Sequence, residues 1–293
     1  MLWDGAMFAK AGKKTVRIVN LIENTEGSRG CIFAHGLSFY IEACDKKMLM
    51  DLGPSADTLE NAGTLGIDLK SVDTVILSHG HYDHSGGILP FAELNDHADI
   101  YMQSIAQDDY YADDGPDAGD ERIRYIGIDK KICDLPQVKK MNGDFEIAEG
   151  IELFTVKNRT HKLPFTNKRL LMKQGGELVR DEFRHEQFLV LTEGGMRILL
   201  GGCAHNGILS IMDAYLEKYG KAPDAVISGF HLMKKTPYRE DQVKEIGDIA
   251  RKLSEYPTVF YTCHCTGLEA FDIMKAVMGD KLIYVHSGDE IIL

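Results

Sequence analysis

The chain has 293 residues, of which 44% are hydrophobic and 27% charged, a composition typical of a soluble globular protein with an ample core. Its net charge of −12 argues against long nucleic acids and anionic membrane surfaces as partners. No stretch approaches the roughly 18 apolar residues of a membrane-spanning helix, residues 1–10 lack the features of a signal peptide, and the cysteines form no disulfide framework, so we expect one cytoplasmic domain over 1–293.

The first part of the chain is predicted to be rich in strands. Short apolar segments with β-branched and aromatic residues are typical of strands in a packed sheet. These segments are 15–21, 32–42, 47–51, 72–77 and 98–103. The stretch 107–121, which carries seven acidic residues, is expected to be a solvated loop.

The stretch ILSHGHYDHSGG, residues 76–87, places three histidines and one aspartate within six positions. Side chains advance about 100° per residue along a helix, so His79 and His81 would point apart there, whereas in extended backbone they face the same side. A helix is therefore not expected. His79 and His81 are predicted to converge on one point, and Asp83 and His84 on another. So many polar side chains in one place would lack hydrogen-bond partners unless they bound a ligand. We therefore interpret the cluster as two adjacent metal positions.

The second part of the chain is predicted to alternate strands with helices. The expected strands are 186–192, 197–201, 224–228, 258–263 and 282–286. The expected helices are 207–218, 240–254 and 267–277. Many strands, followed by strands interleaved with helices, indicate an α/β protein in which stacked sheets are covered by helices.

Four reactive side chains follow the predicted strands of this second part: Cys203, His205, His231 and His264. In α/β proteins ligands gather where strands end and helices begin, so we expect several of these residues to meet the histidine cluster at one place. For His231 two roles remain open, either contact with the substrate or hydrogen bonding that holds its own loop.

Other polar residues receive less specific predictions. The histidines without a visible partner, expected to be structural or solvent-facing, are His35, His97, His161 and His286. Cys263 and Cys265 are expected to pack in the core. Asp51 follows an apolar strand and is placed to fix the second nitrogen of a metal-binding imidazole. Histidine and carboxylate ligands suit several metals, so we expect two divalent ions, zinc first and manganese or iron as alternatives.

The stretch SHGHYDHSGG resembles the His-x-His-x-Asp-His signature of the metallo-β-lactamase superfamily, and MLMDLG resembles the strand and Asp-x-Gly segment that precede it. The motifs ENTEG, AHGLSFYIE, NAGTLGIDL, GGCAHNGI, SGFHLM and CHCTG are together similar to the branch of dihydropterin–ribofuranosylaminobenzene-phosphate synthase-like proteins, to which bacterial phosphodiesterases also belong. The resemblance implies a four-layer αββα sandwich with a metal pair at one edge, between the two sheets.

Carried over position by position, the resemblance implies that His79 and His81 bind the first metal, and that Asp83, His84 and His264 bind the second. Many members of the superfamily have a Gly-His-Thr-type loop that supplies a third histidine to the first site, followed by a strand ending in Gly-Asp, whose carboxylate bridges the two metals. The corresponding region here reads ILLGGCAH and has no such aspartate.

We assign His205 to this bridging gap. Cys203, beside it, is the alternative, or a residue that supports the ligands. His185 and Glu186 are weaker candidates.

A metal pair of this kind implies an activated water with its pKa lowered to about 7, and Asp83, His205 and His231 as catalytic residues. The leading interpretation is hydrolysis of a phosphodiester in a small phosphorylated metabolite. The alternatives are a synthase that condenses a pterin with a ribosyl-aminobenzene phosphate, a lactone or thioester hydrolase, and a metal-binding sensor without turnover. Association of the chain with itself stays open.

The segment 157–185 is the most basic part of the chain. Within 157–184 eight lysines and arginines face three acids, a local balance of +5. Gly175 and Gly176 offer a hinge. We interpret the segment as a lid over the site, in which Lys168 and Arg169 bind an anionic substrate.

Overall fold

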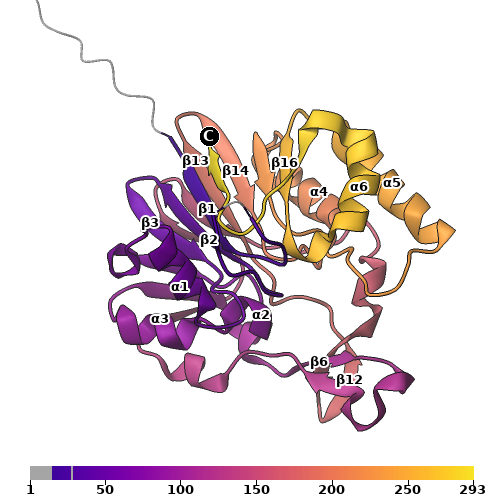
Figure 1. Cartoon of the computed structure of the whole chain (residues 1–293), viewed down its shortest axis with the longest axis horizontal. Coiled ribbons are helices and arrows are strands. Elements are labelled where there is room, and N and C mark those ends of the chain that lie inside the picture. Colours follow the sequence, from indigo (N-terminus) through magenta and orange to yellow (C-terminus); the bar gives the residue numbers. More distant parts are fainter. Residues whose placement is uncertain (1–14, 28) are drawn as a thin grey trace, which may run out of the picture.

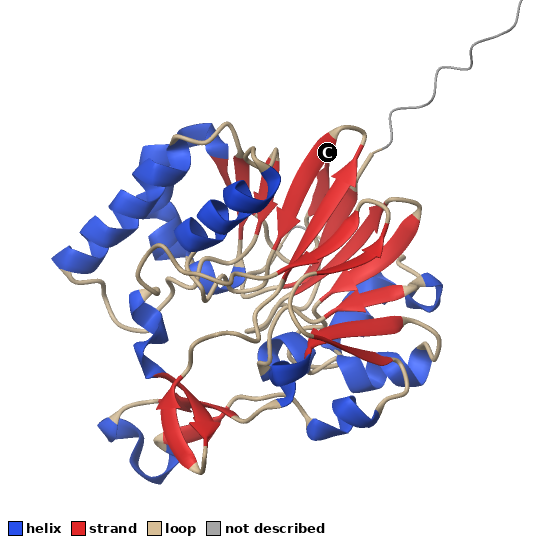
Figure 2. Ribbon diagram, turned by 180° about the vertical axis from the view of Figure 1, so that it is seen from behind, coloured by secondary structure: helices blue, strands red, loops and turns tan. Residues whose placement is uncertain are grey.

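The structure is a computed structural model that describes residues 15–27 and 29–293. Two large sheets lie face to face in it, and helices cover both outer faces (Figures 1 and 2). The expectation about a signal peptide concerns residues 1–10, which lie outside the described residues. No helix in the described part of the chain is long and apolar enough to cross a membrane.

The first sheet has the strand order β18-β1-β2-β3-β4-β5-β8. Its strands are β1 (Arg17–Ile22), β2 (Ser38–Ala43), β3 (Lys46–Met50), β4 (Thr74–Ile76), β5 (Asp99–Gln103), β8 (Val138–Met141) and β18 (Glu290–Ile292). Strands β3, β4, β5 and β8 run parallel, so their carboxyl ends meet at one edge. The histidine cluster follows β4 and therefore lies at this edge.

The second sheet has the strand order β17-β16-β15-β14-β13-β10-β9. Its strands are β9 (Phe145–Ala148), β10 (Ile151–Phe154), β13 (Phe188–Glu193), β14 (Met196–Leu200), β15 (Ala225–Ile227), β16 (Val259–Thr262) and β17 (Leu282–Tyr284). Strands β14 to β17 run parallel. Helices α4 (Ile208–Tyr219), α5 (Glu240–Ser254) and α6 (Leu268–Met278) connect them. The segments that follow β14, β15 and β16 consequently reach a common edge.

Side chains that alternate along each strand build separate cores on its two sides. In β1 and β2, Ile18 and Phe39 pack between the two sheets, whereas Val19 and Tyr40 pack outward. The outward cluster includes side chains of α1 (Asp57–Thr64) and α3 (Ile88–Leu94), and a third cluster lies between the second sheet and α4, α5 and α6. These clusters define four layers, which confirms the expected αββα sandwich.

The strands and helices expected from the sequence are all present, most with ends shifted by one to three residues. The largest difference is at 32–42, where the strand begins only at Ser38. The residues before Ser38 form a loop that is held against Asp83, because the backbone N–H of Leu37 donates to the carbonyl of Asp83 at 3.2 Å. The sequence interpretation missed α1, α3, β8, β9, β10 and β18.

A small third sheet, in the order β12-β11-β6-β7, protrudes from the sandwich (Figure 1). Its strands are β6 (Tyr110–Asp113), β7 (Ile123–Tyr125), β11 (Leu170–Gln174) and β12 (Glu177–Arg180). Two segments far apart in sequence pair here through β6 and β11.

The expectation of a solvated loop at 107–121 is wrong, because β6 and a 3₁₀ turn occupy it. Tyr110 and Ala112 alternate with polar residues and pack with Leu170 in a small buried core. Two of the acids are paired as well, since Asp113 accepts a hydrogen bond from Arg122 and Asp114 accepts one from Arg124.

Candidate metal centre

The histidine cluster spans the end of a strand and the start of a one-turn helix, α2 (Tyr82–Ser85). His79 and His81 precede the helix, and His81 has extended backbone (φ −111°, ψ 148°). Asp83 and His84 lie on the helix, which corrects the expectation that the cluster contains none. The turn still separates the two pairs in the expected manner, because it changes the direction of the chain after His81.

Three imidazoles form what we call the first group: His79, His81 and His205. Their ligand nitrogens all lie within 4.8 Å of one another, and the Nε2 atoms of His79 and His205 are 3.3 Å apart. All three side chains are almost completely buried. The strand ends of the two large sheets thus bring His205 to the cluster, although 126 positions separate it from His79.

Hydrogen bonds on the far side of two of these rings fix their tautomers. The Ser78 hydroxyl donates to Asp51 Oδ2 at 2.6 Å, so it accepts from His79 Nδ1 at 2.8 Å. His205 Nδ1 donates to Asn167 Oδ1 at 3.0 Å. Both Nε2 atoms therefore carry a lone pair, and the two lone pairs point toward each other. Such an arrangement is repulsive unless a cation lies between the two nitrogens.

The second group comprises Asp83, His84 and His264. His84 Nδ1 donates to Asp51 Oδ2 at 2.6 Å, and His264 Nδ1 donates to Asn24 Oδ1 at 2.8 Å. Their Nε2 atoms lie 3.7 Å and 3.5 Å from Asp83 Oδ2.

The Nε2 atoms of His81 and His264 are buried and have no hydrogen-bond partner. A buried polar atom without a partner costs free energy, which a metal ion bound there would offset. The side chains of both groups therefore fit the metal ions that the sequence predicts.

Charge and burial set the protonation of these side chains. Burial lowers the pKa of His81 to about 3, so this imidazole is neutral and able to bind a cation. Burial acts to raise the pKa of Asp83, but the neighbouring imidazoles of His84, His264 and His35 hold it well below its usual value. Burial acts against the charged form of His84 as well, but Asp51 and Asp83 raise its pKa to about 9. A metal ion must therefore displace a proton from His84.

Cys203, not His205, lies between the two groups. Its Sγ is 3.2 Å from His84 Nε2, and it falls within 4.8 Å of ligand atoms of His79, His205 and His264. The assignment of His205 to the bridging gap is thus corrected, because His205 completes the first group. A sulfur at this point can reach a metal ion held by either group.

His185 and Glu186, the weaker candidates for the gap, hold the backbone of the site. The N–H of Gly80 donates to His185 Nδ1 at 2.9 Å, and His185 Nε2 donates to Asp181 Oδ2 at 3.0 Å, so neither nitrogen is free. Glu186 accepts from the backbone N–H of His205 at 2.6 Å. These contacts correct the expectation that either residue fills the gap.

His231 lies beside the first group. Its ring centroid is 4.1 Å from that of His205, and its Nδ1 is buried without a hydrogen-bond partner. Its backbone has φ 49°, and its carbonyl accepts from the Thr166 hydroxyl, so the loop is also held. Both roles considered for His231, contact with a substrate and support of the loop, remain consistent with this position.

The sequence interpretation missed His35, which reaches the second group. Its Nε2 lies 3.4 Å from Asp83 Oδ2, and its ring centroid is 5.0 Å from that of His264. His35 precedes a strand instead of following one, so the rule that ligands gather after strands could not find it. Cys263 packs between the sheets as expected, whereas Cys265 lies close to Cys203 and His264.

The predicted lid contributes to the site through a residue that the sequence interpretation did not select. Asn167, in a 3₁₀ turn (Phe165–Arg169), accepts from His205 Nδ1 and donates to the His205 carbonyl at 2.7 Å. Arg169 forms an ion pair with Asp114, and its role in binding an anionic substrate stays a prediction. Lys168 is exposed.

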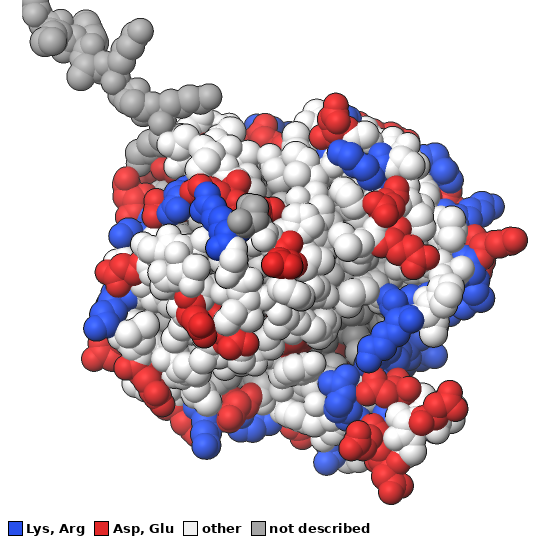
Figure 3. All heavy atoms as spheres, viewed as in Figure 1, with Lys and Arg blue, Asp and Glu red and all other residues white. Residues whose placement is uncertain are grey.

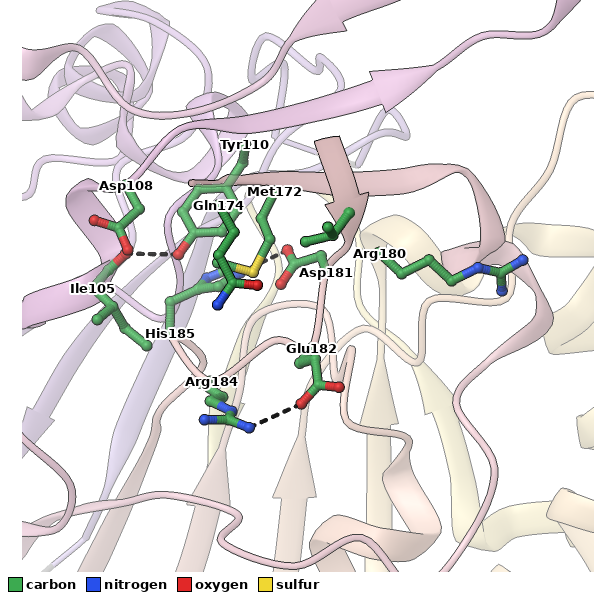
Figure 4. Close-up of a pocket in the computed structure, with 11 residues that line it drawn as sticks. Ile105, Asp108, Tyr110, Met172, Gln174, Arg180, Asp181, Glu182, Arg184 and His185 are labelled. Atoms are coloured by element: carbon green, nitrogen blue, oxygen red, sulfur yellow. Dashed lines mark hydrogen bonds and ion pairs between the residues drawn. The ribbon is translucent and has the colours of Figure 1, made fainter. Parts of the chain in front are cut away.

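A cavity of about 530 Å³ lies between the third sheet and the loop of the first group. Tyr110 and His185 line it with ring centroids 4.1 Å apart, and the His185 ring is 5.5 Å from that of His81. Met172 and Gln174 lie next to these rings (Figure 4). The surface view shows lysines and arginines beside a hollow where the third sheet protrudes (Figure 3).

The contact between Asn167 and His205 supports a first prediction. Replacing Asn167 by alanine removes the acceptor that keeps the His205 proton on Nδ1, so the first group should bind metal about 10- to 100-fold more weakly. The second group should be unaffected. Metal content by elemental analysis after dialysis against a chelator measures this, with Asn142→Ala, an exposed asparagine, as the control. Equal loss from both groups would show that they bind as one unit.

Comparison with known proteins identifies relatives of this chain. Residues 32–162 match the model of the metallo-β-lactamase superfamily. An uncharacterized protein of Methanocaldococcus jannaschii is 30% identical over 277 residues, covering 92% of this chain and 96% of that protein. The same organism has a 7,8-dihydropterin-6-methyl-4-(β-D-ribofuranosyl)-aminobenzene-5'-phosphate synthase that is 29% identical, over 96% of this chain and 98% of the synthase.

A solved structure gives the same relationship. The crystal structure of a metal-dependent hydrolase of the β-lactamase superfamily superposes with a TM-score of 0.77 and 28% identity, over 94% of this chain and 98% of that one. The resemblance seen in the sequence motifs is thereby confirmed, as is the fold. The chain belongs to the metallo-β-lactamase superfamily of metal-dependent hydrolases.

Proposed function

We propose that this protein is a phosphodiesterase with a dinuclear metal centre, acting on a small phosphorylated metabolite. The observation that carries the proposal is the pair of adjacent ligand groups, in which imidazoles held through their Nδ1 atoms direct their Nε2 atoms toward a shared Cys203. Two metal ions about 3.5–4 Å apart stabilise both the attacking and the leaving oxygen of a displacement at phosphorus.

The residues of the chain would position the substrate around this centre. Asp51, Asn24 and Asn167 hold the imidazoles in one orientation, so little reorganisation is needed during the reaction. The cavity next to His185 is of a size that suits the non-reacting part of a small substrate. The exposed Lys168, next to Asn167, would attract a phosphate group.

Cys203 bears on the choice of metal. Histidine and carboxylate ligands alone suit zinc, manganese and iron, but a thiolate favours softer ions such as zinc over manganese. We therefore propose zinc, with iron as the alternative. We also propose a small molecule as the partner instead of a long nucleic acid, supported by the net charge of −12.

Condensation of a pterin with a ribosyl-aminobenzene phosphate is the second candidate function. It is favoured by one specific observation, the synthase of Methanocaldococcus jannaschii that matches this chain over nearly its whole length. Incubating the metal-loaded protein with the two synthase substrates and analysing the products tests this candidate. Condensed product at a rate above that of phosphodiester cleavage would replace the leading proposal.

Turnover of a chromogenic phosphodiester by the zinc-loaded protein tests the leading proposal. His264→Ala should reduce kcat by about 1,000-fold, because loss of a metal ion removes several kcal/mol of transition-state stabilisation and each 1.4 kcal/mol is about tenfold in rate. His161→Ala is the control, since His161 also contacts a carboxylate, Asp213 at 3.1 Å, but lies outside both groups. Wild-type protein that binds two metals and cleaves no diester would contradict the proposal.

A further inference from the structure

His35 lies at the open side of the second group, and its ring nitrogen is within 4.8 Å of ligand atoms of Asp83 and His264. Its side chain is 51% exposed, whereas those of His84 and His264 are fully buried and that of Asp83 is 10% exposed. A molecule that approaches Asp83 from solvent therefore meets the His35 imidazole.

The backbone around His35 is fixed, so its position is built into the fold. Gly36 passes so close to the cluster that an added Cβ would lie 2.5 Å from the carbonyl oxygen of Asp83. The N–H of Leu37 donates to the same oxygen, and the N–H of Ala34 donates to the Glu23 carbonyl at 3.0 Å. The loop is thus held on both sides of His35, with its imidazole facing the carboxylate of Asp83.

One amide side chain sets the tautomers of two imidazoles. Asn24 Oδ1 accepts from His264 Nδ1 at 2.8 Å, which leaves His264 Nε2 bare. Asn24 Nδ2 lies 3.4 Å from His35 Nδ1 and donates to it, which places the His35 proton on Nε2. The Nε2 of His264 therefore has a lone pair that can bind a metal ion, and the Nε2 of His35 carries a proton that can be donated in a hydrogen bond.

We propose that His35 is a substrate-binding residue, whose Nε2–H donates a hydrogen bond to an oxygen of a phosphoryl group bound at the second ligand group. The inference rests on the proposed function, since it names the part of the substrate that is recognised. It follows from the protonated Nε2, its 3.4 Å distance to Asp83 Oδ2, and its exposure. A tetrahedral oxyanion at the second group has an oxygen within reach of this donor.

Inorganic phosphate is the probe that tests His35. Isothermal titration calorimetry on the zinc-loaded full chain should show that His35→Phe binds phosphate at least about tenfold more weakly, because a hydrogen bond to a charged group is lost. His35→Gln keeps an N–H donor and should recover most of the affinity. His97→Phe is the matched control, a half-exposed histidine beside Asp96. Metal content should be the same in every variant.

A second variant examines the tautomer directly. Asn24→Asp keeps an acceptor for His264 Nδ1 but cannot donate to His35, so it should weaken phosphate binding to a similar extent while metal content is unchanged. Unchanged phosphate affinity in His35→Phe or in Asn24→Asp would overturn the inference, as would a wild-type protein that binds no phosphate. Loss of metal in His35→Phe would also overturn it, since His35 would then be a ligand.

Diester turnover is measured separately on the same proteins. Absence of turnover in the wild type, together with phosphate binding that depends on His35, would refute the phosphodiesterase and leave the role of His35 standing. Normal turnover in the wild type, together with phosphate binding that does not depend on His35, would support the phosphodiesterase and refute the role of His35.

Discussion

Asp51→Asn should cost the protein metal at both groups, about 100-fold in affinity at each, although Asp51 is expected to touch neither ion. Asp51 Oδ1 accepts from the Ser78 N–H at 2.7 Å, and its Oδ2 accepts from the Ser78 hydroxyl and from His84 Nδ1. In asparagine the oxygen must stay with the Ser78 N–H, so an NH₂ group faces His84 and the hydroxyl.

That single change reverses two tautomers. His84 Nδ1 must then accept, so the proton that His84 keeps lies on Nε2. The Ser78 hydroxyl must accept from the new amide and donate to His79 Nδ1, which moves the His79 proton to Nε2 as well. Each protonated Nε2 has no lone pair for a cation.

Elemental analysis and competition with a chelator measure the loss in Asp51→Asn. Asp73→Asn serves as the control, because Asp73 also pairs with a neighbour on the first sheet, Lys46 at 3.0 Å, away from the site. Retention of metal at either group by folded Asp51→Asn would show that Ser78 and Asp51 do not govern the ring protons.

Replacing Cys203 by serine should abolish the thiolate signature of the cobalt-loaded protein and weaken metal binding by about tenfold or more. A coordinating thiol loses its proton, and thiolate bound to cobalt(II) absorbs in the near ultraviolet. Cys203 is expected to produce this absorption because its Sγ lies 3.2 Å from His84 Nε2 and near ligand atoms of both groups.

Two variants make the Cys203 experiment decisive. Cys265→Ser should keep the absorption, although Cys265 also lies near His264. His205→Ala should keep it too, while metal content falls by about half, because only the first group loses a ligand. Loss of the absorption in Cys265→Ser, with retention in Cys203→Ser, would show that Cys265 and not Cys203 binds the metal.

The sequence was sufficient for the parts of the site that depend on local geometry. Four ligands within six positions at a strand end, and a histidine or cysteine after each of three later strands, were identified because parallel strands end at the same edge. The periodicity of apolar residues likewise located most strands and helices of the sandwich, since each buries a regular face.

The parts of the site that depend on contacts between residues far apart in the sequence could not be predicted. His35 and Asn24 reach the second group only because Gly36 lets their loop pass against Asp83, and nothing in local sequence reports that contact. Asn167 precedes two basic residues, Lys168 and Arg169, and nothing in the local sequence indicates its contact with His205. The acidic stretch 107–121 was misinterpreted because β6 pairs with β11, and because Asp114 pairs with Arg124 and Arg169, contacts that only the folded chain brings together.

The third sheet has a consequence for how this chain can be altered. Its four strands come from two separate segments, 110–125 and 170–180, which pair with each other through β6 and β11 and form a sheet apart from the two sheets of the sandwich. Removing the segment of β6 would leave an unpaired edge on β11 and uncover Leu170. Removing the segment of β11 would do the same to β6 and Tyr110. The two segments must therefore be removed or exchanged together. Phe183, from the core of this sheet, stacks on His205 at 4.6 Å. Exchanging both segments together would therefore change the wall of the cavity and the contact that supports His205 in a single step.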